Sequence, residues 1–177
     1  MFLDRDGVVN VEKNYVHRIE DFQFMEGIFD LCRVFRDRGF LMVIVTNQAG
    51  IARGFYTLAQ FESLSAWMRR RFSEEGLELS GIYHCPHHPS ITGDCPCRKP
   101  HPGMLLQAAS DLDLDLPHSV LLGDKPSDLE AGRRAGLSRL GLVHGHTSLE
   151  SVRYGAHGNL PLSDFTELIS RLGPDQV

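Results

Sequence analysis

The sequence predicts an α/β fold, a doubly wound parallel sheet covered by helices on both faces, with residues 1–177 in a single domain. Short apolar runs alternate along the chain with longer segments of helical periodicity. The apolar runs are continuous, which is typical of strands buried on both faces of a parallel sheet. A chain of 177 residues is long enough to bury such a sheet in one domain.

The apolar runs and helical segments follow one another in a regular order. We expect strands at 1–3, 41–46, 81–84, 119–123 and 139–143. We expect helices at 28–38, 58–75, 104–112, 127–135 and 162–172. Thr57 and Gln60 form a capping-box pattern at the start of the second helix. Gly39, Gly76 and Gly136 stand where three of the helices should end.

Composition and charge argue against several kinds of partner. A net charge of −5 gives no general attraction to nucleic acid or to a membrane surface. The basic run 69–71 lies in a helical segment and is interpreted as a solvated helix face. No apolar run approaches the roughly 20 residues that span a bilayer, and the N-terminus does not read as a signal peptide. We therefore expect a cytoplasmic monomer with no nucleic-acid or membrane partner.

Two carboxylates follow the first predicted strand. Asp4 and Asp6 are separated by one residue, so in an extended strand their side chains point the same way. Because like charges repel, such a pair needs a cation or a shared proton, and Gly7 lets the chain turn sharply after it. A divalent metal with a phosphate monoester explains the pair best. The alternative is a solvated pair of acids in a turn.

Polar groups also follow the second and fourth predicted strands. Thr46 and Asn47 offer a hydroxyl and an amide to a phosphoryl oxygen, although a Thr-Asn turn is the structural alternative. Asp124 follows the fourth strand. In doubly wound sheets ligands bind outside the carboxyl ends of the strands. The recurrence of phosphate-competent and metal-competent groups at these ends therefore predicts one site.

The third acid completes a candidate magnesium site. Asp124, Asp4 and the backbone carbonyl of Asp6 offer the oxygen ligands that Mg²⁺ prefers. Asp128 lies four residues further on, in the first turn of a helix. It is positioned to orient a metal-bound water or Lys125, but an Asp at a helix start is common without any function.

Two basic residues precede the fourth strand. Lys99 would offset charge on a phosphoryl group, and Arg98 would hold a second phosphate or a sugar oxygen. The parts predict a mechanism in which Asp4 attacks phosphorus while Asp6 protonates the departing oxygen. Asp6 then deprotonates the water that opens the aspartyl phosphate. Mg²⁺, Thr46 and Lys99 would stabilise the transition state.

The four cysteines are unevenly placed. Cys85, Cys95 and Cys97 crowd into one loop, residues 85–97, together with His87. Three thiolates and one imidazole form a closed tetrahedral set suited to structural Zn²⁺. A disulfide or free thiols are the alternatives. The neighbouring histidines that could replace His87 are His84 and His88. The fourth cysteine, Cys32, is expected in the core.

These motifs, in this order, resemble those of the haloacid dehalogenase superfamily. The resemblance covers nearly the whole chain to about residue 143 and rests on 4–7, 46–48, Lys99 and 123–125. It narrows to the heptose 1,7-bisphosphate phosphatase branch through the segments 14–17, 46–54, 85–89 and 97–104. The stretch 144–159 does not match the family's C-terminal region and receives no role; its histidines are interpreted as solvated.

The resemblance implies a role for each matching residue. It implies Mg²⁺ at Asp4, Asp6 and Asp124, and Zn²⁺ at Cys85, His87, Cys95 and Cys97. It implies phosphoryl stabilisation by Thr46 and Lys99, and Lys125 matches a lysine adjacent to the site. The implied substrate contacts are Arg5, Glu12, Lys13, Asn14, Tyr15, Asn47, Gln48, Ala49 and Arg98.

The implied reaction removes the C7 phosphate of D-glycero-D-manno-heptose 1,7-bisphosphate for the synthesis of nucleotide-activated heptose of surface glycans such as lipopolysaccharide. The resemblance also implies a domain without a cap, and the spacing agrees, since few residues separate Asp6 from Thr46. The α or β anomer preference stays open. The nucleophile at position 4 leaves an unusually short first strand, or a start that lies earlier.

Four other interpretations compete. Histidinol-phosphate phosphatases share the zinc loop, but segments 50–54 and 101–104 disfavour them. An enzyme acting on nucleic-acid 3′-phosphate ends would need a basic groove. A phospho-accepting receiver domain of signalling proteins would need neither Asp6 nor the zinc loop. A zinc-stapled binding module would not need the complete set of motifs.

Overall fold

The computed structural model describes residues 1–154 and 159–161. Its described strands form one seven-stranded sheet in the order β3-β2-β1-β4-β5-β6-β7. The strands are β1 (Phe2–Leu3), β2 (Met42–Asn47), β3 (Leu79–Cys85), β4 (Val120–Gly123), β5 (Arg139–His144), β6 (Ser151–Tyr154) and β7 (Asn159–Pro161). The predicted parallel pairing is confirmed from β1 to β5, whereas β6 and β7 pair antiparallel.

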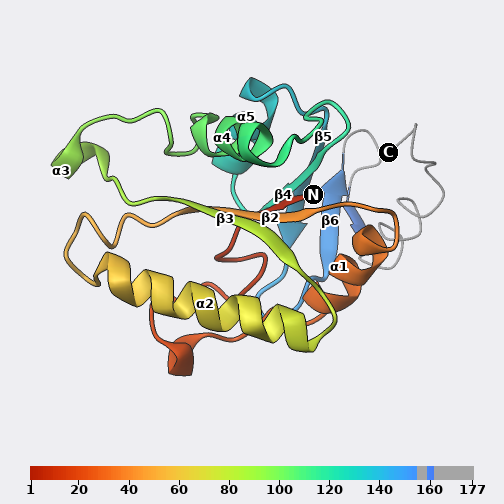
Figure 1. Cartoon of the computed structure of the whole chain (residues 1–177), viewed down its shortest axis with the longest axis horizontal. Helices are drawn as coiled ribbons and strands as arrows, with labels where there is room; N and C mark the ends of the chain where they lie inside the picture. Colours follow the sequence, from red (N-terminus) through yellow and green to blue (C-terminus); the bar gives the residue numbers. More distant parts are fainter. Residues whose placement is uncertain (155–158, 162–177) are drawn as a thin grey trace.

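Helices cover both faces of this sheet, as predicted. The described helices are η1 (Ile19–Asp21), α1 (Ile28–Arg36), α2 (Leu58–Glu74), α3 (Pro89–Thr92), α4 (Gly103–Leu112) and α5 (Pro126–Arg134). Figure 1 shows α4 and α5 on one side of the sheet and α1 and α2 on the other. Four of the predicted helices therefore match α1, α2, α4 and α5 within about two residues at each end. The fifth, at 162–172, lies outside the described residues.

The core consists of two apolar clusters, one on each face of the sheet. Alternate residues of the strands point to opposite faces, so neighbours in β1 such as Phe2 and Leu3 belong to different clusters. On one face the strands pack against α1 and α2 through Leu3, Ile44, Leu122, Leu31, Phe35, Leu64, Met68 and Phe72. On the other they pack against α4 and α5 through Phe2, Val43, Val45, Leu121, Met104, Leu105, Ala108 and Ala131.

The predicted start and end of α2 are both confirmed. The Thr57 hydroxyl accepts from the backbone N–H of Gln60 at 3.2 Å, and the Gln60 side chain accepts from the backbone N–H of Thr57 at 2.8 Å. Two otherwise unsatisfied N–H groups at the helix start are thus paired. Gly76 follows α2 with a φ of +71°, a left-handed conformation that glycine adopts without steric cost.

The first strand is short but central. Phe2 and Leu3 are both fully buried, and each pairs with β2 on one side and β4 on the other. The backbone N–H of Asp4 donates to Leu122 at 2.9 Å and continues the ladder by one bond. The two-residue strand therefore delivers Asp4 to the carboxyl edge of the sheet. Residues 4–41 hold only η1 and α1 before β2, so no cap domain is inserted there.

The sequence prediction missed the two antiparallel strands. It assigned no role to 144–159, yet β6 lies beside β5 and carries β7 at the sheet edge. Strands at such an edge need only one buried face, and in β6 the buried Val152 is followed by the exposed Arg153. Neither strand therefore contains the continuous apolar run that marked the central strands.

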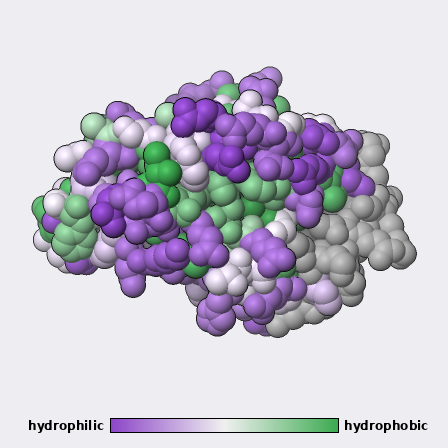
Figure 2. Space-filling view, turned by 90° about the horizontal axis from the view of Figure 1, so that it is seen from below, coloured by the Kyte–Doolittle hydropathy of each residue, from purple (hydrophilic) through white to green (hydrophobic). Residues whose placement is uncertain are grey.

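One face of the surface combines apolar and hydrophilic areas. Figure 2 shows this face from below, with apolar residues gathered near its centre and hydrophilic residues around them. Over the described residues the exposed large apolar side chains are Tyr15, Ile19, Leu41, Phe55, Leu58, Ile91 and Leu106.

Within the same part of the chain, no helix combines the length and apolar character that crossing a membrane requires.

Candidate active site

A cavity of about 450 Å³ lies at the carboxyl ends of β1, β2 and β4. Its lining includes Asp4, Asp6, Glu12, Asn14, Tyr15, Thr46, Asn47, Gln48, Ala49, Arg98, Lys99, Lys125 and Asp128, all of them predicted site residues. Tyr56 and Ser127 also line it and were not predicted. The structure thus brings together the strand-end residues that the sequence placed at one edge of the sheet.

Three carboxylates converge beside the cavity, and two of them, Asp4 and Asp128, line it. One carboxylate oxygen each of Asp4, Asp124 and Asp128 lies within 4.8 Å of the other two. Gly7 makes this approach possible, because a Cβ there would lie 2.5 Å from the Asp124 Oδ2 atom. Its φ of +90° also favours glycine. A turn without a side chain therefore lets Asp124 come close to the first strand.

Lys99 is the cation buried among these acids. Its Nζ lies 2.7 Å from Asp4 Oδ1 and 2.7 Å from Asp128 Oδ1, and it donates to the Val45 carbonyl at 2.9 Å. Only 4% of Lys99 is exposed. Burial lowers the pKa of Lys99, but the carboxylates of Asp4 and Asp128 outweigh it and the net shift is upward. The side chain therefore stays charged, with all three N–H donors engaged.

Burial dominates the electrostatics of the acids themselves. It raises the pKa of Asp4 to about 7, and the ammonium of Lys99 opposes that rise. Burial also raises the pKa of Asp124, against the opposing charge of Lys125. Three carboxylates in one buried place repel one another unless a cation relieves them. The site is therefore electrostatically prepared for a further positive charge.

The donor set fits Mg²⁺. The Asp124 Oδ1 atom is buried and has no hydrogen-bond partner within the described part of the chain. A hard cation takes such carboxylate oxygens as ligands and retains several waters. The residues that would hold it are Asp4 and Asp124, with the Asp128 carboxylate beside them. Asp128, predicted as a supporting residue, thus lies in the acidic cluster itself.

The carboxylate of Asp6 lies apart from this acidic cluster. Arg5 Nη2 donates to both of its oxygens at 2.8 Å, Asn10 Nδ2 donates to Oδ1 at 3.1 Å, and Gln48 Nε2 donates to Oδ2 at 3.0 Å. These donors fix the orientation of the carboxylate, which still lines the cavity. The Asp6 carboxylate is therefore not a member of the acidic cluster.

Asn47 has a structural task that the sequence did not reveal. Its Nδ2 donates to the Lys99 carbonyl at 3.1 Å, and its Oδ1 accepts from the Lys99 N–H at 3.1 Å. The amide therefore clamps the backbone that carries Lys99. Arg98, which directly precedes Lys99, donates to the His87 carbonyl at 3.2 Å and lines the cavity.

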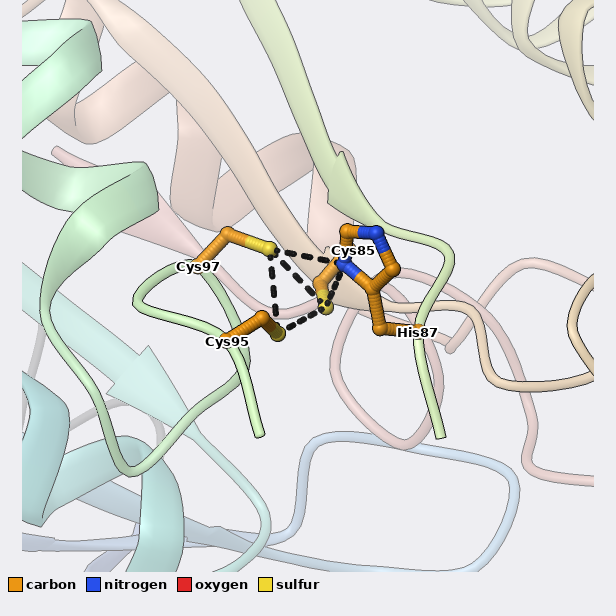
Figure 3. A group of neighbouring side chains, drawn as sticks. All are labelled: Cys85, His87, Cys95 and Cys97. Atoms are coloured by element: carbon orange, nitrogen blue, oxygen red, sulfur yellow. Dashed lines mark hydrogen bonds between the residues drawn. The ribbon is translucent and has the colours of Figure 1, made fainter. Parts of the chain in front are cut away.

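The predicted zinc loop forms a compact cluster (Figure 3). The sulfur atoms of Cys85, Cys95 and Cys97 lie 3.1 to 3.5 Å apart, and His87 Nδ1 lies 3.3 Å from Cys97 Sγ. These separations exceed the roughly 2.05 Å of a disulfide bond, so all three thiols are free. Three thiolates and one imidazole nitrogen fit tetrahedral Zn²⁺.

The two alternative histidines are engaged elsewhere. His88 Nε2 lies 2.7 Å from Arg53 Nη2, and the His84 ring packs against Phe61 with a centroid distance of 4.4 Å. The backbone of the cysteine loop also contacts a residue that lines the cavity, because the Gln48 N–H donates to the Cys85 carbonyl at 2.7 Å. The loop thus connects to the strand end that carries Thr46.

Comparisons with known proteins agree with this geometry. A family model described as HAD-hydrolase-like matches residues 96–168. The crystal structure of D,D-heptose 1,7-bisphosphate phosphatase from B. bronchiseptica, complexed with magnesium and phosphate, matches with a TM-score of 0.77. Its sequence identity is 29%, and the match covers 96% of each chain.

Two curated relatives have a higher sequence identity to this chain than the B. bronchiseptica phosphatase has. The D-glycero-beta-D-manno-heptose-1,7-bisphosphate 7-phosphatase of Yersinia pestis is 49% identical over 148 residues, 81% of this chain and 79% of the relative. The D-glycero-alpha-D-manno-heptose-1,7-bisphosphate 7-phosphatase of Photorhabdus laumondii is 46% identical over 177 residues, 97% of this chain and 94% of the relative. The chain belongs to the heptose-bisphosphate phosphatase family.

Membership in the heptose-bisphosphate phosphatase family confirms the resemblance seen in the sequence, and with it the class of phosphoric monoester hydrolases. The magnesium in the B. bronchiseptica structure agrees with the acidic cluster of this chain. The two curated relatives carry opposite anomers in their names. Family membership therefore leaves the anomer open.

Two predicted substrate contacts of this family member lie outside the cavity. Arg5 is 1% exposed, and its guanidinium contacts Asp6 and the Val16 carbonyl. Lys13 instead points its Nζ at the Asp21 carbonyl, 3.4 Å away. Lys125 bridges the cavity wall, with its Nζ 3.3 Å from Glu12 Oε2 and 3.4 Å from Asp124 Oδ2.

Sequence reasoning missed Tyr56 and Ser127 for different reasons. Tyr56 lies in an irregular loop directly before the capping box of α2, and no periodicity marks it. Ser127 belongs to the first turn of α5, where a serine is common without any function. Lys125 and Asp128, which flank Ser127 and were predicted, could have indicated that this part of the chain lines the cavity.

Proposed function

We propose that this chain is a Mg²⁺-dependent phosphatase that removes the C7 phosphate of D-glycero-D-manno-heptose 1,7-bisphosphate and leaves heptose 1-phosphate. The observation that carries the proposal is the buried Asp4 at the base of the cavity, with Lys99 at 2.7 Å and Asp124 beside it. The relatives, at 46–49% identity, are named for this substrate.

Asp4 is the proposed nucleophile. One of its carboxylate oxygens forms a bond to phosphorus while the bond from phosphorus to the C7 oxygen breaks. The C7 oxygen keeps the electron pair and takes a proton from Asp6. Asp6, now ionised, takes a proton from a water whose oxygen attacks phosphorus, and the bond to Asp4 breaks to give inorganic phosphate.

The surrounding donors stabilise charge on the phosphoryl oxygens. Thr46 offers its hydroxyl, and Lys99 supplies a fixed ammonium beside the nucleophile. Bound Mg²⁺ would neutralise phosphoryl charge at Asp4 and Asp124. Because these groups are buried and already oriented, little reorganisation is needed during the reaction.

The outer part of the cavity would hold the sugar and the second phosphate. Arg98 offers a guanidinium that can bind phosphate oxygens in a bidentate manner, and Lys125 adds a second cation. The other lining residues that we propose as substrate contacts are Glu12, Asn14, Tyr15, Asn47, Gln48 and Ala49.

We propose that Cys85, His87, Cys95 and Cys97 bind a structural Zn²⁺. All four positions of a tetrahedral ion are then protein ligands, so no position is open to substrate. Arg98 reaches the carbonyl of His87, which ties this loop to the substrate side of the cavity. Reduced thiols as ligands suit a reducing compartment, so we place the reaction in the cytoplasm.

The test is phosphate release in Mg²⁺ from three substrates at equal low concentration: both anomers of heptose 1,7-bisphosphate and histidinol phosphate. We expect kcat/KM to favour one heptose anomer over the other substrates by more than about tenfold, or ~1.4 kcal/mol of transition-state binding. A preference for histidinol phosphate would overturn the substrate assignment and leave the chemistry intact. Release from none of the three would overturn both.

A further inference from the structure

Tyr56 contacts the site through Gln48, to which the proposed mechanism gives no chemical step. It lines the cavity but is only 4% exposed, and its hydroxyl donates to Gln48 Oε1 at 2.6 Å. Gln48 is 2% exposed. A buried hydroxyl and a buried amide at this distance form one unit, because neither can turn to water for a partner.

The other end of the Gln48 amide faces the reacting residues. Its Nε2 donates to Thr46 Oγ1 at 2.7 Å and to Asp6 Oδ2 at 3.0 Å. An amide has one donor end and one acceptor end, and because the Tyr56 hydroxyl engages the acceptor Oε1, the donor Nε2 is left facing Asp6 and Thr46. If the amide turned over, its carbonyl oxygen would face the Asp6 carboxylate, acceptor against acceptor.

The orientation also decides what Thr46 can do. A hydroxyl can donate one hydrogen bond and accept others. Because Thr46 Oγ1 accepts from Gln48, its own proton remains for a phosphoryl oxygen in the cavity. Gln48 therefore holds the carboxylate of Asp6 and makes Thr46 a donor.

The ring of Tyr56 is packed between named neighbours. The His17 ring stacks on it with a centroid distance of 4.9 Å and an interplanar angle of 7°. Gly50 lies against the ring, since a Cβ there would come within 2.1 Å of the Tyr56 Cε1 atom. Burial raises the pKa of Tyr56 to about 12, so its hydroxyl keeps its proton near neutral pH.

We infer that Tyr56 is a positioning residue, which fixes the Gln48 amide so that it donates to both Asp6 and Thr46. The inference rests on the proposed function, because it assigns Asp6 and Thr46 the roles given there. Tyr56 itself touches neither of the reacting groups through its hydroxyl. A residue that merely fills space would need its ring but not this hydrogen bond.

The first test compares Tyr56→Phe with Tyr83→Phe. Both variants lose one hydroxyl, but that of Tyr83 donates to Asp111 at 3.0 Å, in a contact unrelated to the cavity. We expect Tyr56→Phe to lower kcat by about tenfold, ~1.4 kcal/mol, with KM nearly unchanged. Tyr83→Phe should leave both constants unchanged. An unaltered kcat in Tyr56→Phe would overturn the inference.

A double-mutant cycle tests the route of the effect. If Tyr56 acts through Gln48, adding Tyr56→Phe to Gln48→Ala should cause no further loss of kcat. Equal, additive losses in the two backgrounds would overturn the inference. Thermal unfolding of each variant separates these effects from loss of the fold.

A readout without turnover separates this inference from the proposed function. The side-chain amide of Gln48 gives its own NMR resonances, which we expect to shift in Tyr56→Phe and to stay in place in Tyr83→Phe. An unshifted Gln48 amide in Tyr56→Phe would overturn the positioning role. Absence of phosphate release by the wild type would overturn the function, while the amide resonances still decide the role of Tyr56.

Discussion

Lys99 is the residue that allows the acidic cluster to exist in the folded chain. Its ammonium is buried between Asp4 and Asp128, 2.7 Å from each. Removing one partner of a buried pair costs about 3–5 kcal/mol when it leaves the other charge alone. Here a change at Asp4 still leaves Lys99 paired with Asp128. The nucleophile can therefore be neutralised without stranding the cation.

The variant Asp4→Asn follows from this arrangement. We expect phosphate release to fall by at least about a thousandfold, ~4 kcal/mol, because an amide cannot form the aspartyl phosphate. The amide oxygen can still accept from Lys99, so the fold should be kept. Steady-state kinetics and a thermal melt measure the two effects. Appreciable residual turnover would contradict the nucleophile assignment.

Gly7 carries a second prediction at the scale of the residue. Gly7→Ala should destabilise the fold by about 1–2 kcal/mol through its left-handed backbone and also weaken Mg²⁺ binding, because the new Cβ displaces Asp124. Gly39→Ala is the matched control. It has a similar φ of +80° but no neighbouring atom within 4 Å. Denaturant unfolding and Mg²⁺ titration of both variants give the comparison, and equal Mg²⁺ affinity would contradict the argument.

At the scale of the element, apolar continuity made the central strands predictable. Strands buried on both faces, such as β2 with Val43, Ile44 and Val45, contain unbroken apolar runs. The antiparallel strand β6, between β5 and β7, has the sequence of a partly exposed segment and could not be recognised this way. A capping box could be predicted because it is local, as Thr57 and Gln60 show.

The cysteine loop is the element whose prediction is easiest to test. We expect Cys95→Ser to lose bound zinc and to lower the melting temperature, because a structural zinc site contributes directly to folding. KM should rise more than kcat falls, since Arg98 is tied to this loop through the His87 carbonyl. Metal analysis, a thermal melt and kinetics measure the three effects.

Cys32→Ala is the control for that variant. Cys32 lies on the buried face of α1, away from the loop, so its loss should reduce stability while the zinc content stays unchanged. Zinc retained in Cys95→Ser would mean that the ligand set is wrong.

The whole molecule explains which parts of the site the sequence could not reveal. Parallel strands gather their carboxyl ends at one edge, so Asp4, Thr46 and Asp124 could be placed together in advance. Contacts that depend on side-chain geometry could not be predicted from the sequence. The pattern that predicted Asn47 as a phosphate donor gave no sign that its amide also clamps the Lys99 backbone, and the link between Tyr56 and the reacting groups has no sequence pattern.

Ligand binding should be visible in the stability of the whole chain. The three carboxylates of the acidic cluster, two of them buried, repel one another in the folded state and separate on unfolding, so Mg²⁺ should bind the folded chain preferentially. At about 100 times its Kd, a ligand of this kind adds ~2.7 kcal/mol, or roughly 5–10 °C in Tm for a domain of this size. A thermal melt with and without Mg²⁺ measures the rise.

Asp124→Asn isolates the source of that rise. The variant replaces the charged carboxylate by a neutral amide and so removes one negative charge from the cluster, which makes the repulsion that Mg²⁺ relieves smaller. We expect Asp124→Asn to melt at or above the wild-type temperature without Mg²⁺ and to gain little when Mg²⁺ is added. Tyr83→Phe should keep the full rise. An equal rise in Asp124→Asn would place the bound ion elsewhere on the molecule, because the acidic cluster would then not account for the coupling between metal and fold.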